Sequence, residues 1–220
     1  MRPEKPHPQN SFFKNFERVI SFSDGVFSIA ITLMVLSLTV PVIATGNITT
    51  ELPMSLIGEW STFFSYIISF LVIGNWWIVH HRFFQHINQA DRTLLWLNLI
   101  FLLFITLIPF MTALMIEYPG TFVAVAFFAL AQAIAGIILV ALWYHATKGR
   151  RLSDPDLSDI TVRYYMVRGI LGSVVYLISI GIAVFNAYLA QLSWLFIGIL
   201  FWWLGREFYR SRLTVIDQSQ

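Results

Sequence analysis

The apolar residues of this chain fall in long blocks without charges, separated by short polar segments. A block of about 20 apolar residues matches an α-helix that crosses a bilayer core, because each helical residue adds about 1.5 Å. The pattern therefore predicts an all-α membrane protein with six transmembrane helices per chain. The expected spans are 19–42, 59–79, 93–115, 121–144, 166–187 and 192–208.

Composition agrees with this pattern. Of the 220 residues, 57% are hydrophobic and 12% are charged, whereas a water-soluble domain carries roughly twice that share of charge. The six spans leave little room for a soluble domain, so we expect a single transmembrane domain over residues 1–220. A cleaved signal peptide is an alternative for the first block, but the long leader, the acidic residue within the block and the length of the block argue against it.

The basic residues are distributed asymmetrically. All 14 Lys and Arg residues lie in the segments that six spans place on one side. Because bases are retained on the cytoplasmic side, we expect both termini in the cytoplasm and a multi-pass protein of the cell membrane. The opposite loops carry Glu51, Glu59 and Glu117 without any base. An acidic rim that concentrates cations and an ordinary solvated surface are both open interpretations.

The first span carries two charged residues, Arg18 and Asp24, at its cytoplasmic end. Ionised groups at that depth must pair, face water or accept several hydrogen bonds, so we expect both to face inward. Six residues apart they lie on different faces of a helix, and each needs its own partner from another helix or subunit. A structural clamp and an ion or proton site are both compatible with the spacing, which favours the clamp.

A stripe of mostly aliphatic residues follows the same span over about a third of its circumference. Such a stripe is typically a packing or lipid face. Arranged around an axis, it would instead form a hydrophobic constriction that gates by dewetting, with one hydroxyl per chain offered to a cation. Its members are Gly25, Ile29, Thr32, Leu33, Leu36 and Val40.

The end of the second span carries two adjacent histidines, His80 and His81. Adjacent helical residues diverge by about 100°, and the chain has no cysteine, so a metal or haem site is not expected. A hydrogen bond from one histidine to Asp24 or Ser23 is the favoured role. Three isolated amides are expected to bridge helices; they are Asn98, Gln132 and Asn186.

Recognisable catalytic and cofactor motifs are absent from the sequence. It has no phosphate-cradling glycine loop, no nucleophile elbow and no His-Glu-x-x-His helix, so neither an enzyme nor a bound cofactor is expected. No basic segment interleaved with aromatics indicates nucleic-acid binding. The filter loop of ordinary potassium channels is missing too.

The segment Arg18-x-x-x-Phe22-Ser23-Asp24, followed by Gly-Val-Phe-Ser-Ile-Ala-Ile-Thr-Leu, resembles the signature of the transmembrane protein 175 family of lysosomal potassium channels and their prokaryotic relatives. The Trp-x-x-His-His-Arg-Phe-Phe end of the second span is similar as well. The resemblance implies a cation channel in which the first helix of each of four six-span units lines the pore. Because the signature occurs once here, a fourfold pore would require a homotetramer.

The resemblance also implies residue roles. Ile29 matches the main hydrophobic constriction, Leu33 and Leu36 match the aliphatic layers beyond it, and Thr32 matches a threonine that coordinates potassium. The motif that anchors the pore helix matches seven positions, namely Arg18, Phe22, Ser23, Asp24, Trp77, His80 and His81.

We therefore expect a potassium-permeable leak channel that conducts ions passively. Its partners would be potassium, with other monovalent cations and protons as further candidates, together with membrane lipids and other copies of the chain. A proton-coupled secondary transporter with a relay through Asp24, His80 and His81 is the alternative, although no inverted repeat supports it. A non-transporting scaffold is disfavoured because the loops are short.

Overall fold

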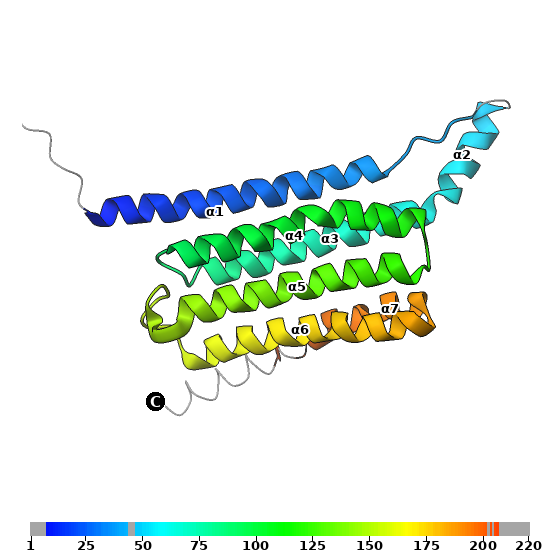
Figure 1. Cartoon of the computed structure of the whole chain (residues 1–220). Helices are drawn as coiled ribbons and strands as arrows, with labels where there is room; N and C mark the ends of the chain where they lie inside the picture. Colours follow the sequence, from blue (N-terminus) through cyan, green and yellow to red (C-terminus); the bar gives the residue numbers. More distant parts are fainter. Residues whose placement is uncertain (1–7, 44–46, 202, 204, 207–220) are drawn as a thin grey trace, which may run out of the picture.

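The computed structural model describes residues 8–43, 47–201, 203, 205 and 206. These residues form a bundle of long helices that run roughly parallel to one another (Figure 1), and the described part contains no strand beyond one isolated bridge. The α-helices (α) and 3-10 turns (η) are α1 (Pro8–Leu33), η1 (Met34–Ser37), α2 (Ile48–Gly58), α3 (Trp60–Phe84), α4 (Arg92–Glu117), α5 (Phe122–Thr147), η2 (Lys148–Arg150), α6 (Asp159–Phe185) and α7 (Ala187–Ser193).

Five helical segments are long and apolar enough to cross a membrane, which confirms the all-α class and five of the expected spans. The sixth expected span, 192–208, is described only in part. An apolar helical segment covers Ala187–Phe201, which is shorter than a full crossing, and residues 202, 204, 207 and 208 lie outside the described residues. The five segments are Phe16–Ser37, Thr62–Phe84, Arg92–Glu117, Phe122–Arg150 and Asp159–Phe185.

The first span ends earlier than its apolar pattern predicts. The α-helix stops at Leu33, continues as the 3-10 turn η1 and becomes extended at Leu38, which has ψ of 120°. Pro41 explains this end, because proline has no N–H to donate and disfavours helical geometry in the residue before it. The expectation of helix up to residue 42 is therefore wrong.

Side-chain caps explain where other helices begin. Asn47 accepts a hydrogen bond from the Thr49 N–H and starts α2, a helix that the apolar pattern does not predict. Ser158 accepts one from the Thr161 N–H, so α6 begins at Asp159 rather than at 166. Such caps satisfy N–H groups that have no partner within the helix.

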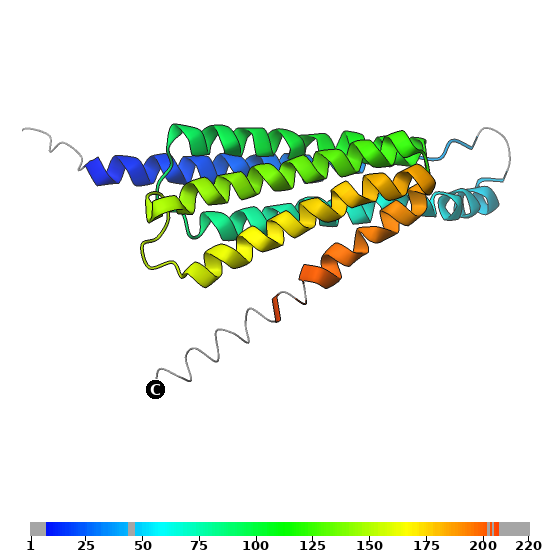
Figure 2. The ribbon, with the colours of Figure 1, turned by 60° about the horizontal axis from the view of Figure 1, so that its bottom comes forward.

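Helix α5 lies at the centre of the bundle and packs against both α4 and α6. Many of its buried residues are small, including Ala129, Ala133 and Gly136, and small side chains let membrane helices approach closely. On the far side of the bundle from α6 and α7, α1 packs against α3 and α4 (Figure 1). In the turned view, α7 begins beside the end of α6 and runs back at an angle to it (Figure 2).

Two loops meet at the end of the bundle where α1 begins (Figure 1). The Asn88 N–H donates to the Leu152 carbonyl at 2.8 Å, and the Asp154 N–H donates to the His86 carbonyl at 3.0 Å. The connections that carry Arg92 and the bases of η2 are therefore joined, while Glu117 ends α4 at the opposite end. The structure thus separates the basic and acidic loops of the described part.

Candidate functional site

One face of α1 is fixed to the rest of the chain. Its buried side chains recur at three- and four-residue spacing, as expected for a single helical face. Phe27 lies 5.5 Å from the His80 ring of α3 and 6.1 Å from the Phe101 ring of α4, measured between ring centroids. The buried residues of this face are Phe16, Ser23, Phe27, Ala30 and Met34, the last in η1.

A buried polar chain joins α1, α4 and α3 within this contact. The Asn98 amide Nδ2 donates to Ser23 Oγ at 2.9 Å, and Asn98 Oδ1 lies 2.9 Å from His80 Nε2. Ser23 in turn donates to the Val19 carbonyl at 2.9 Å. All three side chains of this chain, Ser23, Asn98 and His80, are at most 1% exposed. We call them the Ser23–Asn98–His80 network.

The network corrects one detail of the sequence analysis. A direct hydrogen bond from a histidine to Ser23 or Asp24 was expected, but Asn98 stands between His80 and Ser23. Asn98 can do this because an amide offers both a donor and an acceptor, whereas Ser23 already donates its proton to the backbone. The predicted role of Asn98 as a bridge between helices is confirmed.

Aromatic rings enclose His80. The ring stacks on Phe84 at 4.1 Å between centroids and on Phe101 at 5.7 Å, and Phe27 closes a third side. Together with burial this removes His80 from water and holds its ring in one orientation. A buried side chain held so closely is suited to fixing helices in register rather than to exchanging protons with solvent.

The Asp24 carboxylate has a separate partner. Trp77 Nε1 of α3 donates to Asp24 Oδ1 at 2.8 Å. Trp77 stacks in turn on His81, and His81 Nε2 lies 3.0 Å from the Gln85 amide. The expectation that Asp24 finds a partner on another helix is confirmed, and Trp77 and His81 lie together beside it.

Arg18 and Phe22 differ from the rest of the anchoring motif. Both are exposed, and Arg18 forms no hydrogen bond or ion pair with any residue that the structure describes. The expectation that Arg18 faces inward, with a partner from another helix or subunit, therefore stays a prediction. Ser23 and Phe27 lie on the buried face of α1, and Arg18 projects from the opposite side of the helix.

The aliphatic stripe of α1 lies on its exposed face. Ile29 is 61% exposed and Leu33 is exposed as well. The stripe continues beyond α1 with Leu36, which lies in η1 and is 74% exposed, and with Val40, which is exposed in the extended segment after η1. Thr32 lies among them, and its Oγ1 donates within the helix to the carbonyls of Ser28 at 2.9 Å or Ile29 at 3.0 Å. No element of the described chain covers this stripe.

A charged cluster lies where the two joined loops meet, with Asp91 and Arg151 just outside the membrane-length segments and His145 near the end of Phe122–Arg150. Asp91 caps α4 through the Leu94 N–H, and its carboxylate lies 2.9 Å from His145 Nε2 and 2.6 Å from Arg151 Nη2. Partial burial would raise the pKa of Asp91, but the hydrogen bonds from Leu94 and His145 and the positive charge of both bases lower it below its ordinary value. Sequence reasoning missed this cluster, although an Asp directly before an apolar block is a helix-start signal.

The other singled-out amides have different roles. Trp76 Nε1 donates to Gln132 Oε1 at 2.7 Å and joins α3 to α5, which confirms Gln132 as a bridge. Asn186 instead caps α7 through the N–H groups of Tyr188 and Leu189, so the expectation of a bridge there is wrong. No group of three or more metal-binding side chains occurs among the described residues.

Membrane-length helices joined by short loops define a multi-pass α-helical membrane protein. Its relatives identify the family. The sequence model described as endosomal/lysosomal potassium channel TMEM175 matches residues 18–109, which begin at Arg18 of the motif. A Streptomyces collinus protein named as a potassium channel is 38% identical over 174 residues, which cover 77% of this chain and 83% of that protein. The chain therefore belongs to the TMEM175 family, a family of ion channels and not of enzymes.

Two further relatives extend this comparison. The crystal structure of a lysosomal potassium-selective channel TMEM175 homolog from Chamaesiphon minutus superimposes with a TM-score of 0.72 at 28% identity, covering 89% of this chain and 98% of that one. The human endosomal/lysosomal proton channel TMEM175 is 26% identical over 181 residues, which cover 81% of this chain but 36% of the human protein. The shared fold thus extends over nearly the whole chain.

Proposed function

We propose that this protein is a potassium-permeable cation leak channel that assembles as a homotetramer of six-span subunits. In this assembly α1 lines a pore on the fourfold axis, and both termini lie on the cytoplasmic side of the cell membrane. The observation that carries the proposal is the division of α1 into a fixed face and an uncovered aliphatic stripe that contains Thr32. The bacterial relatives that are named as potassium channels support potassium as the ion.

The stripe gives the proposed pore a constriction. Ile29, Leu33 and Leu36 would each contribute one side chain to a ring around the axis. Aliphatic side chains offer no ligand to a cation, so an ion that passes such a ring loses part of its hydration shell, and a narrow ring expels water altogether. Ile29 is the main constriction in this proposal, with Leu33 and Leu36 forming the layers beyond it.

Thr32 would offset part of this dehydration. Its hydroxyl gives its proton to a backbone carbonyl of the same helix, which leaves the oxygen lone pairs for a cation. Four such oxygens around the axis form a weak site that an ion can both enter and leave, as conduction requires. Discrimination between potassium and sodium would depend on this ring.

The anchoring contacts argue against the proton-coupled transporter. A relay through Asp24, His80 and His81 would need titratable groups in continuous contact. Between His80 and Ser23 stands the Asn98 amide, which does not titrate, and the partner of Asp24 is the Trp77 indole, which only donates. These contacts are suited to holding the pore helix in a fixed position against α3 and α4. The name of the human relative keeps protons as a second permeant ion in the proposal.

Currents across a planar bilayer that contains the purified full chain test this function. A potassium gradient should drive discrete unitary currents that reverse near the potassium equilibrium potential and do not saturate at low ion concentrations. Slow, saturable flux in liposomes without unitary steps would favour a carrier. Cross-linking that stops at dimers would overturn the fourfold arrangement.

A further inference from the structure

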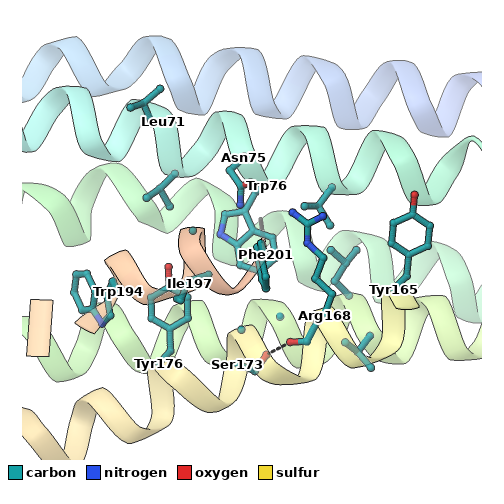
Figure 3. Close-up of a pocket in the computed structure, with 18 of the residues that line it drawn as sticks. Leu71, Asn75, Trp76, Tyr165, Arg168, Ser173, Tyr176, Trp194, Ile197 and Phe201 are labelled. Carbon is teal, nitrogen blue, oxygen red and sulfur yellow. Dashed lines mark hydrogen bonds between the residues drawn. The ribbon is translucent and has the colours of Figure 1, made fainter. Parts of the chain in front are cut away.

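A cavity of about 450 Å³ lies on the side of the bundle away from α1, between α3, α5, α6 and the apolar segment Ala187–Phe201 (Figure 3). We call it the α3–α6 groove. Its size falls in the range of roughly 300–1,000 Å³ that is usual for ligand pockets. The ion pathway proposed above does not use it, and its walls are mostly apolar; they include Leu71, Trp76, Tyr176, Trp194 and Phe201.

One charged side chain reaches into this apolar groove. Arg168 points from α6 toward Trp76 and Phe201 (Figure 3). Its guanidinium carbon lies 4.3 Å from the centroid of the Phe201 ring, and Nη1 donates to the Tyr164 hydroxyl at 3.2 Å. Its Nε is buried and has no hydrogen-bond partner. No carboxylate in the described part of the chain forms an ion pair with Arg168.

The position of Arg168 within a membrane-length helix makes it unfavourable for its guanidinium to lack an anionic partner. At about 1.5 Å per residue it lies about 14 Å from the start of α6, within the Asp159–Phe185 span. A charged side chain within a membrane-spanning segment is unfavourable unless it pairs, faces water or reaches the membrane interface. A guanidinium prefers anions that accept its parallel N–H groups, and phosphate is the best match besides carboxylate.

The groove is basic at one end and apolar along the rest of its length, as the headgroup and acyl chains of a phospholipid would require. Arg82, near the C-terminal end of α3, lines the groove at the end of the bundle that carries the basic loops. Leu71 and Ile68 precede it on α3 and line the groove farther from that end, and both are exposed. The groove therefore joins a basic end to an apolar stretch that is open to the bilayer.

We propose that the α3–α6 groove binds a membrane phospholipid with an anionic headgroup. The phosphate lies between Arg168 and Arg82, and an acyl chain follows the apolar wall past Trp76 and Trp194. A phospholipid supplies both the phosphate for the two arginines and the acyl chain for the apolar wall, whereas free phosphate supplies only the phosphate. Basic pockets between membrane helices recognise anionic headgroups in the same way.

The direct test measures which lipid stays with the protein. The full chain is extracted from vesicles of phosphatidylcholine with a minor share of phosphatidylglycerol, and native mass spectrometry counts the retained lipids. About one phosphatidylglycerol per chain should remain, well above its share in the vesicle. The Arg168→Gln variant should lose roughly tenfold in this preference, and excess inorganic phosphate should not displace the lipid. No preference in the wild type, or displacement by phosphate, would overturn the proposal.

Two matched variants keep the test decisive. Arg163 lies on the same helix, is exposed and does not line the groove, so Arg163→Gln should retain the lipid. Gly198 lines the groove, and a Cβ there would meet no atom within 4 Å. Gly198→Leu should therefore fold normally and expel the lipid while Arg168 remains. Equal retention by Gly198→Leu and the wild type would show that the lipid binds elsewhere.

A second copy of the chain is the competing occupant. Because the sequence contains no cysteine, Leu71→Cys provides a single thiol at the open side of the groove. In detergent without phosphatidylglycerol this thiol should react with a maleimide, and added phosphatidylglycerol should slow the reaction. A thiol that is protected without any phosphatidylglycerol would mean that another chain covers the groove, which overturns the proposal.

Discussion

The two faces of α1 carry similar apolar side chains in opposite surroundings. Phe27, Ala30 and Met34 are buried against α3 and α4, whereas Ile29 and Leu36 are more than half exposed. The difference between the faces is polar: the buried face contains Ser23 of the Ser23–Asn98–His80 network, and the exposed stripe contains Thr32, whose hydroxyl is used within its own helix. Inter-helix hydrogen bonds therefore mark the face that holds the helix, and hydrophobicity alone does not.

The sharpest way to break this comparison is to remove the centre of the network. Asn98→Leu leaves the His80 ring buried without its hydrogen-bond partner, whereas the Ser23 hydroxyl keeps its bond to the Val19 carbonyl. Because a buried group without a partner costs about 1–3 kcal/mol, the free energy of unfolding should fall by about that amount in detergent, as measured by thermal unfolding. Thr106→Ala removes an exposed hydroxyl from the same helix and should change stability little. Equal stability of the two variants would mean that the network does not hold α1.

The exposed face should respond in function rather than in stability. Ile29→Asn places a polar ring where the proposed constriction expels water, so conductance should rise. If hydration lowers the barrier by about 1.4 kcal/mol, the unitary current rises about tenfold. Thermal unfolding should stay near that of the wild type, because the Ile29 side chain is 61% exposed within the chain. Unchanged or reduced current in a planar bilayer would contradict the assignment of Ile29.

A finer distinction concerns the hydroxyl within the stripe. Thr32→Ala removes the proposed oxygen ligand but keeps the helix, so the preference for potassium over sodium should shrink. The reversal potential under bi-ionic conditions should move toward zero. Thr106→Ala serves again as the control, since that hydroxyl is exposed on α4. An unmoved reversal potential for Thr32→Ala would exclude the threonine from selectivity.

The smallest change in stability is expected at the charged cluster around Asp91, which is held by ion pairs and not by a buried neutral network. Asp91→Asn keeps a side chain that can cap α4 but loses the ion pairs with His145 and Arg151, and the loss should be no more than about 1 kcal/mol at pH 7. Because folding lowers the pKa of Asp91, its contribution is fully present above the unfolded-state pKa of about 3.9 and is lost progressively as pH falls through the lower pKa of the folded state.

Unfolding measured between pH 7 and pH 3 tests this contribution. The gap between the wild type and Asp91→Asn should narrow toward the acid end, since Asp91 no longer pairs once it is protonated. Asp91→Ala should remain less stable than Asp91→Asn at every pH, because it also loses the cap, which is worth about 1 kcal/mol. A constant gap between the wild type and Asp91→Asn would mean that the ion pairs contribute nothing.

Much of the fold could be predicted from the sequence, because bilayer thickness dictates span length. The blocks at 93–115 and 121–144 match α4 and α5, and their ends differ from those of the helices by at most three residues. Helix α2 was missed because Thr49, Thr50 and Glu51 interrupt its short apolar run. The early end of α1 depends on Pro41, a local signal that the apolar count overlooks.

The site was predictable in type but not in pairing. An ionised group in a membrane needs a partner, which placed Asp24 and the histidines among the candidates. Which partner each one meets depends on the relative depth of the helices, and a sequence does not give that depth. Asn98 was therefore expected to bridge helices without a known destination. The groove around Arg168 could not be predicted either, since it exists only once α6 and the segment after it pack against α3.

Two neighbouring residues of α3 contact opposite sides of the bundle. Trp77 donates to Asp24 on α1, while Trp76 donates to Gln132 on α5 and forms part of the groove wall. Successive residues of a rigid helix differ by about 100° in direction. A rotation of α3 about its axis would therefore move both indoles together, and it would couple the α1 contact to the α3–α6 groove.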